Sequence, residues 1–241
     1  MNPIPNPSPL PAAVVGVTNV EGIATALGST CALFEGGNVS CWSRLSGSVT
    51  VTAVPELTGS VAIANGVTEC GLLPDGKVIC TGGFLASSIT VAGDATAITV
   101  ASSSIDAAVG SPIGCALVAG GSIQCWQTVN GPGAGLGSAV VPLAAATAVA
   151  TSGAHTCAVL ADTTVACWGD NLFGELGNGT TEDSETPVPV SNLSGVTALA
   201  TGWYHTCAVL ADGTGACWGN NQLRSNEGGI TDATTPVTVT F

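Results

Sequence analysis

The sequence predicts an all-β protein, a β-propeller of five four-stranded blades with one disulfide inside a hairpin of each blade. Three observations lead to this fold class. All ten cysteines fall into pairs with nine residues between the partners, the pairs recur every 39 to 50 residues, and the apolar residues are mostly small or β-branched. A repeat of this length is typical of propeller blades and exceeds that of leucine-rich repeats.

The segment inside each cysteine pair is expected to form a β-hairpin. If the two cysteines face each other, the three central residues form the loop, whose third residue is Gly37, Gly76, Gly121 or Gly213. A three-residue loop favours glycine there because that residue is left-handed. The fourth repeat has Thr163 instead, which adds strain but keeps the spacing. This register predicts the disulfides Cys31–Cys41, Cys70–Cys80, Cys115–Cys125, Cys157–Cys167 and Cys207–Cys217.

The cysteine spacing also decides between disulfides and metal. Zinc sites use closely spaced ligands such as C-x2-C, and no such spacing occurs in the chain. We therefore expect no metal centre and no cofactor. Each bridge closes a short loop, which contributes about 2.5–3 kcal/mol in the chain-entropy model. Persistent disulfides imply an oxidising compartment, so we expect a secreted, periplasmic, extracellular or cell-surface protein unless the source is a hyperthermophile.

Short runs before and after each hairpin supply the other two strands. Runs of small and β-branched residues suit the crowded innermost strand; they lie at 23–27, 61–64, 97–100, 147–150 and 196–200. Proline-containing segments at 186–190 and 235–240 suit an outer edge strand. Residues 157–160 are apolar on both faces. They need a neighbouring sheet on each side, which favours a closed ring over an open solenoid.

The repeats predict one propeller domain over residues 18–241, preceded by an N-terminal arm at 1–17. The expected repeat boundaries are approximately 18–57, 58–93, 94–143, 144–191 and 192–241. Residues 9–17 resemble an outer strand, although five repeats already provide one each. This surplus strand either lies over the final blade of its own ring or adds to an edge of another copy, a head-to-tail contact that grows a filament.

Charge excludes one class of partner. The net charge is −13, and Arg44, Lys77 and Arg224 are the three basic residues, so no basic surface is available to neutralise phosphates. We expect no nucleic acid partner. No membrane span is predicted either, because Gly, Ser, Thr and Pro142 interrupt the uncharged stretch 107–161. No signal peptide is recognisable at the start of the sequence.

The fourth and fifth repeats share a longer motif than the others. It begins with a glycine, Gly153 or Gly202, which is followed after one or two residues by His-Thr-Cys-Ala-Val-Leu at 155–160 and 205–210. The motif continues with Cys-Trp-Gly at 167–169 and 217–219. These motifs resemble the regulator of chromosome condensation repeat, which forms propellers. The resemblance is extensive over 145–241. The first three repeats share the cysteine hairpin and, at Trp42 and Trp126, the tryptophan after the second cysteine, which Thr81 replaces in the second repeat.

The resemblance implies a binding protein. Family members of the nucleus and cytosol exchange nucleotides on a small GTPase and touch chromatin, but the acidic composition and the cysteine pairs argue against both roles here. Secreted bacterial relatives, which include a β-lactamase inhibitor, bind proteins across a propeller face and are the better match. No binding motif of that inhibitor is recognisable in this chain, so none of its inhibitory residues can be transferred.

The two histidines, His155 and His205, occupy the same place in adjacent repeats, which favours a structural, hydrogen-bonded role over catalysis or metal binding. The tryptophans that follow a cysteine, including Trp168 and Trp218, point to the blade face opposite the bridge and are expected to pack between blades. Trp203 and Tyr204 lie in a connecting turn and are the candidate contact residues for a partner.

Five acidic residues lie in one long loop and could offer oxygen ligands to a cation, although their spacing matches no calcium-loop template. They are Asp170, Glu175, Glu182, Asp183 and Glu185. No Ser-His-Asp arrangement is recognisable, so an enzyme would have to use carboxylates of this loop. We predict a non-catalytic extracellular β-propeller that acts as a protein-binding or structural surface module, with a glycan as another ligand. The alternatives are a self-assembling filament subunit and a carboxylate-based hydrolase.

Overall fold

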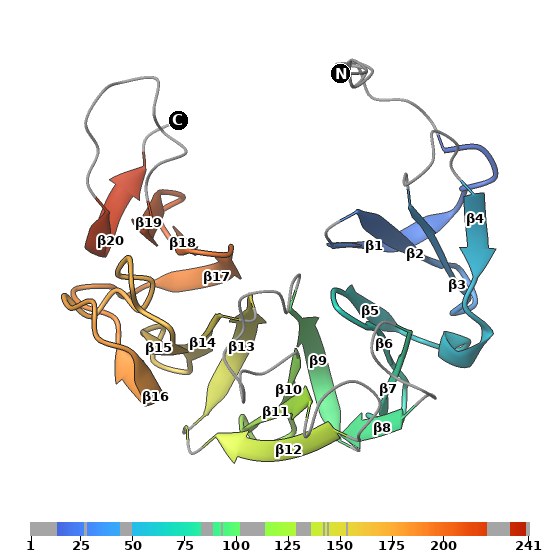
Figure 1. Cartoon of the computed structure of the whole chain (residues 1–241), viewed down its shortest axis with the longest axis horizontal. Helices are drawn as coiled ribbons and strands as arrows, with labels where there is room; N and C mark the ends of the chain where they lie inside the picture. Colours follow the sequence, from blue (N-terminus) through green and yellow to red (C-terminus); the bar gives the residue numbers. More distant parts are fainter. Residues whose placement is uncertain are drawn as a thin grey trace, which may run out of the picture.

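The computed structural model describes residues 14–26, 28–43, 50–82, 89–92, 94–101, 114–128, 136–141, 143, 145–152, 154–220 and 232–239. These residues form twenty strands and one short 3-10 helix. The strands make five four-stranded antiparallel sheets. Figure 1 shows the sheets arranged one after another around a common axis, as the blades of a propeller. The all-β propeller class that the cysteine repeat predicts is confirmed.

Each sheet is built from strands that are consecutive in sequence. Blade 1 is β1 (Val20–Ala26), β2 (Ser29–Phe34), β3 (Val39–Ser43) and β4 (Thr50–Ala53), and the helix η1 (Pro55–Leu57) leads to blade 2. Blade 2 is β5 (Ala62–Asn65), β6 (Glu69–Leu72), β7 (Val78–Thr81) and β8 (Ile89–Ala92). Blade 3 is β9 (Ala95–Val100), β10 (Gly114–Val118), β11 (Ile123–Thr128) and β12 (Leu136–Val141). Blade 4 is β13 (Ala146–Thr151), β14 (His155–Leu160), β15 (Val165–Gly169) and β16 (Ser184–Pro189). Blade 5 is β17 (Val196–Thr201), β18 (His205–Leu210), β19 (Gly215–Gly219) and β20 (Ala233–Val239).

The first strand of each blade lies nearest the axis, as the runs of small residues predict. Strand β1 contacts β5, β5 contacts β9, and β13 contacts both β9 and β17. Small side chains permit this close approach of five strands around one axis. The prolines of β16 and β20 lie at the opposite, outer edge of their sheets, where no further strand needs the missing N–H.

The central hairpins have the predicted register and loop. In blade 4, Cys157 lies opposite Cys167, and the Leu160 N–H donates to the Thr164 carbonyl across the three-residue loop. The third loop residue is left-handed in all five blades. Its φ is 77° at Gly37, 80° at Gly76, 82° at Gly121, 67° at Thr163 and 86° at Gly213. Thr163 offsets part of its strain because its hydroxyl oxygen accepts a hydrogen bond from the Gly195 N–H at 3.0 Å.

Each blade contains one disulfide between its second and third strands, and the Cα atoms of the partners lie 4.0–4.1 Å apart. This distance is typical of a directly opposed, non-hydrogen-bonded pair. One bridge inside one hairpin of every blade is the predicted arrangement.

The hydrophobic core lies between successive blades rather than within any one of them. We call the side of a blade that carries its disulfide the disulfide face, and the opposite side the alanine face. Between blades 4 and 5, the disulfide face of blade 4 packs on the alanine face of blade 5, which includes Ala208, Ala216 and Trp218. Between blades 3 and 4, the alanine face contributes Ala158 and Trp168. Trp168 and Trp218 therefore pack between blades, as expected.

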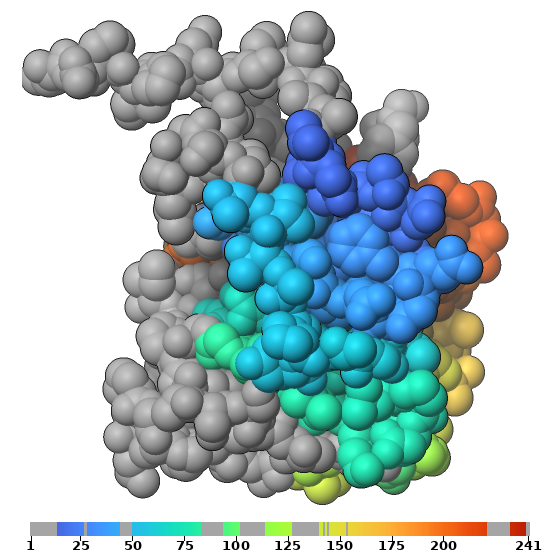
Figure 2. Space-filling model, turned by 90° about the vertical axis from the view of Figure 1, so that its right-hand side faces the viewer, coloured from blue at the N-terminus to red at the C-terminus, as the bar shows by residue number. Residues whose placement is uncertain are grey.

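Successive blades stack in the same sense along the chain. Figure 2, which views the arc from the side of blade 1, shows the residues of blade 1 in blue lying against those of blade 2 in teal. In this first interface, Cys31, Leu33 and Val39 of blade 1 pack with Leu57 and Ile79. Ile79 of blade 2 takes the position that alanine has in blades 4 and 5.

The expectation of a closed ring is wrong for the described residues. They form an open arc, with blade 5 and blade 1 on the two sides of its opening (Figure 1). The apolar pattern at 157–160 does require a neighbour on each side, and blades 3 and 5 provide them.

The expected strand at residues 9–17 is not formed by its described part. Residues 1–13 lie outside the described residues, and 14–17 form a turn in which the Val17 N–H donates to the Val14 carbonyl at 3.3 Å. Val15 in this turn is 92% exposed. Among the described residues there is no helix that is long and apolar enough to cross a membrane.

Candidate functional site

A long loop after β15, residues 170–183, forms the junction between blades 4 and 5. Asn171 organises this loop from a fully buried position. Its Nδ2 donates to the carbonyls of Thr180 and Glu182 at 3.1 and 3.0 Å, and its Oδ1 accepts from the Leu176 N–H at 2.9 Å. One amide side chain therefore satisfies backbone groups on both limbs of the loop, which fixes the loop shape.

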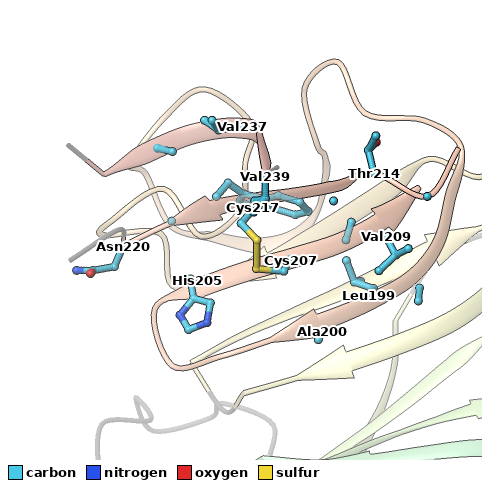
Figure 3. Close-up of a pocket in the computed structure, with 17 residues that line it drawn as sticks. Leu199, Ala200, His205, Cys207, Val209, Thr214, Cys217, Asn220, Val237 and Val239 are labelled. Carbon is cyan, nitrogen blue, oxygen red and sulfur yellow. A yellow bond between two sulfur atoms is a disulfide. The ribbon is translucent and has the colours of Figure 1, made fainter. Parts of the chain in front are cut away.

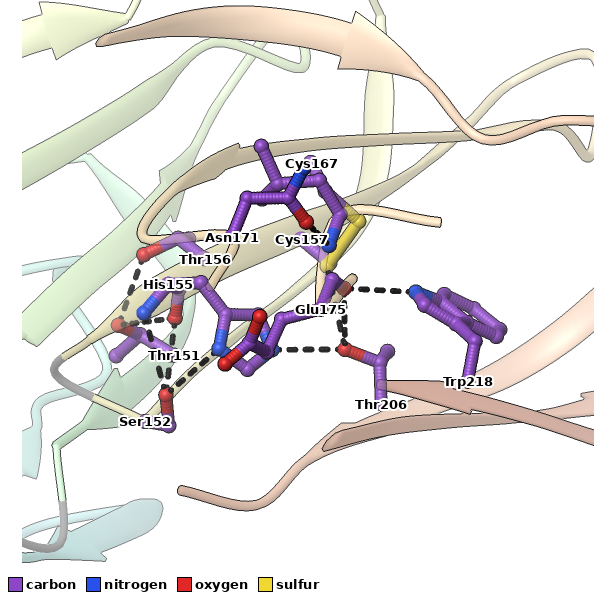
Figure 4. Close-up of a disulfide and its surroundings, with 11 residues drawn as sticks. Thr151, Ser152, His155, Thr156, Cys157, Cys167, Asn171, Glu175, Thr206 and Trp218 are labelled. Carbon is purple, nitrogen blue, oxygen red and sulfur yellow. Dashed lines mark hydrogen bonds between the residues drawn. A yellow bond between two sulfur atoms is a disulfide. The ribbon is translucent and has the colours of Figure 1, made fainter. Parts of the chain in front are cut away.

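The loop also fastens blade 5 to blade 4 (Figure 4). The carbonyl of Glu175 accepts hydrogen bonds from Trp218 Nε1 at 2.7 Å and from Thr206 Oγ1 at 3.2 Å. The Gly179 N–H donates to the Thr234 carbonyl in β20 at 2.8 Å. Gly177 has a φ of 65°, and a Cβ there would lie 2.7 Å from Trp218 Nε1. The indole and the loop are therefore packed too closely for any larger residue.

His155 lies in the same junction and has the structural role predicted for it. Its side chain is 1% exposed. Its Nε2 lies 2.7 Å from Thr206 Oγ1 in blade 5, and its Nδ1 lies 3.2 Å from Ser152 Oγ. Because the Thr206 hydroxyl donates to Glu175, Nε2 carries the ring proton and donates to Thr206. Burial and, to a smaller extent, the nearby His205 lower the pKa of His155 to about 3, so the ring is neutral.

The five acidic residues predicted for the loop, of which Glu185 lies in β16, do not converge on a cation site. Asp183 Oδ1 accepts the Asn171 N–H at 2.8 Å, and Glu175 Oε2 accepts the Phe173 N–H at 2.8 Å. Glu182 and Glu185 are exposed. Within the described ranges, no three His, Cys, Asp or Glu side chains are placed to hold a metal ion. The carboxylates of Asp183 and Glu175 thus support the loop backbone.

Burial affects the titration of two carboxyls in this loop. It raises the pKa of Glu175, whose side chain is 1% exposed, and it raises the pKa of Asp170, with Asp183 adding to the increase in both. Raised carboxyl pKa values are also a mark of catalytic acids. Here Glu175 lies inside the junction, so its carboxyl does not face a cleft that would admit a substrate.

The exposed part of the junction is aromatic. Phe173 and Tyr204 meet edge to face with ring centroids 5.2 Å apart, and Trp203 and Tyr204 meet with centroids 6.1 Å apart. Trp203 is 38% exposed, and Leu172 beside Phe173 is 71% exposed. We call these four residues the aromatic cluster. It joins the predicted contact residues to two residues that the sequence did not indicate, because Phe173 reaches Tyr204 only after blades 4 and 5 stack.

Comparison with protein families identifies the repeats of this junction. A family model described as the regulator of chromosome condensation (RCC1) repeat matches residues 164–209. A second model of the same description matches residues 146–175 and 196–223. No curated protein matches the sequence.

Solved structures match over most of the chain. Yeast RCC1 (Prp20), solved with Kap60, superposes with a TM-score of 0.74 and 16% identity over 92% of this chain and 61% of that chain. Prp20p from Saccharomyces cerevisiae, described with its binding to Gsp1p and histones, superposes with a TM-score of 0.73 and 16% identity over 92% of this chain and 63% of that chain. Human WBSCR16 superposes with a TM-score of 0.72 and 16% identity over 92% of this chain and 67% of that chain.

These likenesses support the fold. The chain spans 61 to 67% of the length of the three matched chains. At 16% identity a shared fold does not carry a shared activity. The family models add sequence agreement over the fourth and fifth blades, where the histidine and tryptophan motifs lie. The fourth and fifth blades therefore match RCC1 repeat models, and the chain has the fold of an RCC1-type β-propeller.

Proposed function

We propose that the chain is a non-catalytic protein-binding module of an extracellular or cell-surface environment, and that the aromatic cluster contacts the partner. The observation that carries this proposal is the exposure of Trp203 and Leu172 on a junction that is otherwise tightly hydrogen-bonded. Aromatic residues on a rigid support lose little conformational freedom on binding and are enriched among the residues that dominate interface energies. The five disulfides favour an oxidising environment.

The charge around the aromatic cluster favours a partner with basic residues. Glu182 and Asp183 are exposed on the loop that carries Phe173, Glu185 is exposed at the start of β16, and the net charge of the chain is −13. An apolar centre with an acidic rim fits a protein surface on which an apolar side chain is flanked by Lys or Arg. Two of the structural neighbours are described with protein partners, Kap60 in one case and Gsp1p and histones in the other. A protein partner is therefore preferred over a glycan.

The test is affinity capture from the native culture or host surface with the immobilised chain. The informative variant is the double substitution Leu172→Ala and Trp203→Ala, and the matched control is Ile23→Ala, which alters a 63% exposed side chain on blade 1. We expect a partner that the wild type and the control retain, that the double variant loses, and that elutes with increasing salt. Equal retention by the double variant would contradict the proposed surface, and loss of the ligand after periodate oxidation would indicate a glycan.

The non-catalytic part of the proposal has its own test. A hydrolase built on this loop would depend on Glu175 or Asp183, so turnover of any substrate in a broad screen that is abolished by Glu175→Gln or Asp183→Asn would overturn it. We expect no such activity, because Glu175 is 1% exposed and both carboxylates accept backbone hydrogen bonds within the loop.

A further inference from the structure

The aromatic cluster lies at one end of the blades, which we call the loop end. Trp203 and Tyr204 lie in the turn between β17 and β18, and the loop after β15 leaves from the same end, since Phe173 meets Tyr204 there. The hairpin loop between β18 and β19 lies at the other end, which we call the hairpin end. Figure 3 shows this separation, because His205 beside the turn and Thr214 of the hairpin lie at opposite ends of blade 5.

The N-terminal arm, residues 1–17, enters blade 1 at the hairpin end. The carbonyl of Asn19, just before β1, accepts a hydrogen bond from the N–H of Glu35 in the hairpin loop of that blade at 3.4 Å. In blades 1 to 4, the carbonyl of the third hairpin-loop residue accepts an N–H from the residues that lead into the next blade, so these hairpin ends lie on one side. The arm and the aromatic cluster therefore belong to opposite ends of the propeller.

The composition of the arm favours one conformation. Proline recurs at every second position from 3 to 11, and no side chain before Glu21 is charged. Proline fixes its own φ near that of polyproline II and restricts the residue before it to extended conformations, so alternate prolines restrict every residue of the run. The run thus favours a polyproline II helix, which makes no internal hydrogen bonds and loses little conformational freedom when it binds.

The aromatic cluster has the features that bind a polyproline II segment. The ring of Tyr204 is inclined to those of Phe173 and Trp203 by 66° and 76°, so the rings meet as ridges rather than as one flat surface. Grooves lined by aromatic rings accept the proline rings of such a segment. Within the described ranges, the indole N–H of the 38% exposed Trp203 has no hydrogen-bond acceptor. The unpaired carbonyls of a polyproline II helix would supply one.

Charge favours the arm over other parts of the chain as an occupant of the cluster. Glu182 and Asp183 are exposed on the loop that carries Phe173, and they repel acidic segments of another copy. Residues 1–20 carry no acidic side chain, so they approach this rim without that repulsion. The net charge of −13 still makes two copies repel each other, and salt screens this repulsion.

A second copy suits the arm better than the blades of its own molecule. A six-residue strand such as β17 is about 20 Å long, and polyproline II rises by about 3.1 Å per residue. Within one molecule, the arm would use about six residues to pass from the hairpin end to the loop end, which leaves few prolines for the cluster. Blades 1 and 5 also lie on the two sides of the opening of the arc (Figure 1), which lengthens the path. Against the loop end of another copy, the whole run is available.

We propose that the proline run, residues 3–11, of one copy binds the aromatic cluster of a second copy. A proline ring stacks on Trp203, and the indole N–H donates to a carbonyl of the run. Leu172, which is 71% exposed, extends the apolar contact. This inference rests on the proposed function, because it assigns an occupant to the same surface, and the arm and an external partner then compete for it. Each copy offers one arm and one cluster, so copies associate as their concentration rises.

The test is sedimentation and light scattering of the full chain over a concentration series. We expect association that increases with concentration and with salt, because salt screens the repulsion between the acidic copies. The triple substitution Pro5→Ala, Pro7→Ala and Pro9→Ala should weaken association by about 10-fold or more, because it removes proline rings and the preformed helix together. It alters no residue of a blade. The matched control, Asn6→Ala with Ser8→Ala, keeps every proline and should associate like the wild type.

A mixing experiment identifies the two sides of the contact. The triple proline variant lacks the arm side and Trp203→Ala lacks the cluster side, so each alone should be mainly monomeric where the wild type is associated. Their equimolar mixture retains one intact arm and one intact cluster, so it should form a one-to-one dimer. A mixture that stays monomeric overturns the proposal. So does association that the triple variant retains, or a wild type that is monomeric at all concentrations, as binding of the arm to its own cluster would give.

The same variants separate this proposal from the proposed function. The triple proline variant keeps the aromatic cluster and loses the competing arm, so it should capture an external partner at least as well as the wild type. Capture of the partner should weaken with salt, whereas association of copies should strengthen. Capture that needs the cluster, together with association that ignores the prolines, would overturn the arm contact alone. Association lost in Trp203→Ala and in the triple variant, with capture unchanged in both, would support the arm contact and overturn the proposed function.

Discussion

Acidification is expected to weaken the junction of blades 4 and 5 through His155. The pKa of this residue is about 3 in the folded chain and 6.5 when it is exposed. Between these values the unfolded chain binds a proton that the folded chain does not, so stability is full above pH 6.5 and is lost as the pH falls. Stability is lost at about 1.36 kcal/mol per pH unit only below about pH 6.5, so the loss between pH 7 and pH 4.5 is about 2.5 kcal/mol.

The assay is urea unfolding with the disulfides intact, followed by tryptophan fluorescence at both pH values for the wild type and His155→Gln. Carboxyls with raised pKa values, such as Glu69 and Glu175, act in the opposite direction, because protonation on acidification favours their folded state. They are present in both proteins, so the comparison cancels them. We expect the wild type to lose about 2.5 kcal/mol more than the variant. A His205→Gln control retains the buried His155, so it should lose far more stability on acidification than His155→Gln, and slightly less than the wild type because His205 contributes to the lowered pKa of His155. Equal pH responses of wild type and His155→Gln would refute the reasoning.

Two further predictions concern contacts between blades. Gly76→Ala should destabilise the chain by more than Gly213→Ala in thermal unfolding. Both glycines are left-handed, but a Cβ at Gly76 would meet the backbone of Asp94, whereas one at Gly213 would meet open space. Equal losses of stability would show that the backbone conformation alone is responsible. Trp218→Phe should cost about 1–3 kcal/mol in urea unfolding, because it removes the indole N–H that donates to the Glu175 carbonyl while keeping most of the buried ring. A variant as stable as the wild type would contradict the role of that bond.

The local architecture follows from the sequence because it depends on local spacing. The nine residues between Cys157 and Cys167 determine the hairpin, its three-residue loop and the facing of the two cysteines. The same count predicts a left-handed residue at position 163 even though the residue is threonine, and the structure has it. The alternation of Cys167 and Trp168 likewise predicts which side chain faces each neighbouring blade.

The closure of the ring could not be predicted in this way. It depends on the angle between successive blades, which arises from the packing of Ala208, Trp218 and many other side chains across an interface. A strand that is apolar on both faces indicates only that neighbours exist on both sides. The pattern at 157–160 is the same whether the arc closes or stays open.

The candidate site was predicted in part for a similar reason. Trp203 and Tyr204 could be noticed as aromatic residues in a turn, but their contact with Phe173 joins residues of two blades. The sequence could not show the role of the acidic residues in the loop, because composition does not reveal hydrogen bonds. Asp183 and Glu175 accept N–H groups of their own loop, and Asn171, which organises it, resembles any loop asparagine in the sequence.

The account depends most on one disulfide-closed hairpin per blade, so disulfide mapping tests it most directly. The intact chain should weigh ten hydrogen atoms less than its reduced form, since all ten cysteines are paired. Digestion with pepsin at low pH, where thiol exchange is slow, should then release the five local pairs, each joining cysteines ten positions apart. A free thiol, or any bridge that joins two different repeats, would contradict the assignment of one hairpin and one disulfide to every blade.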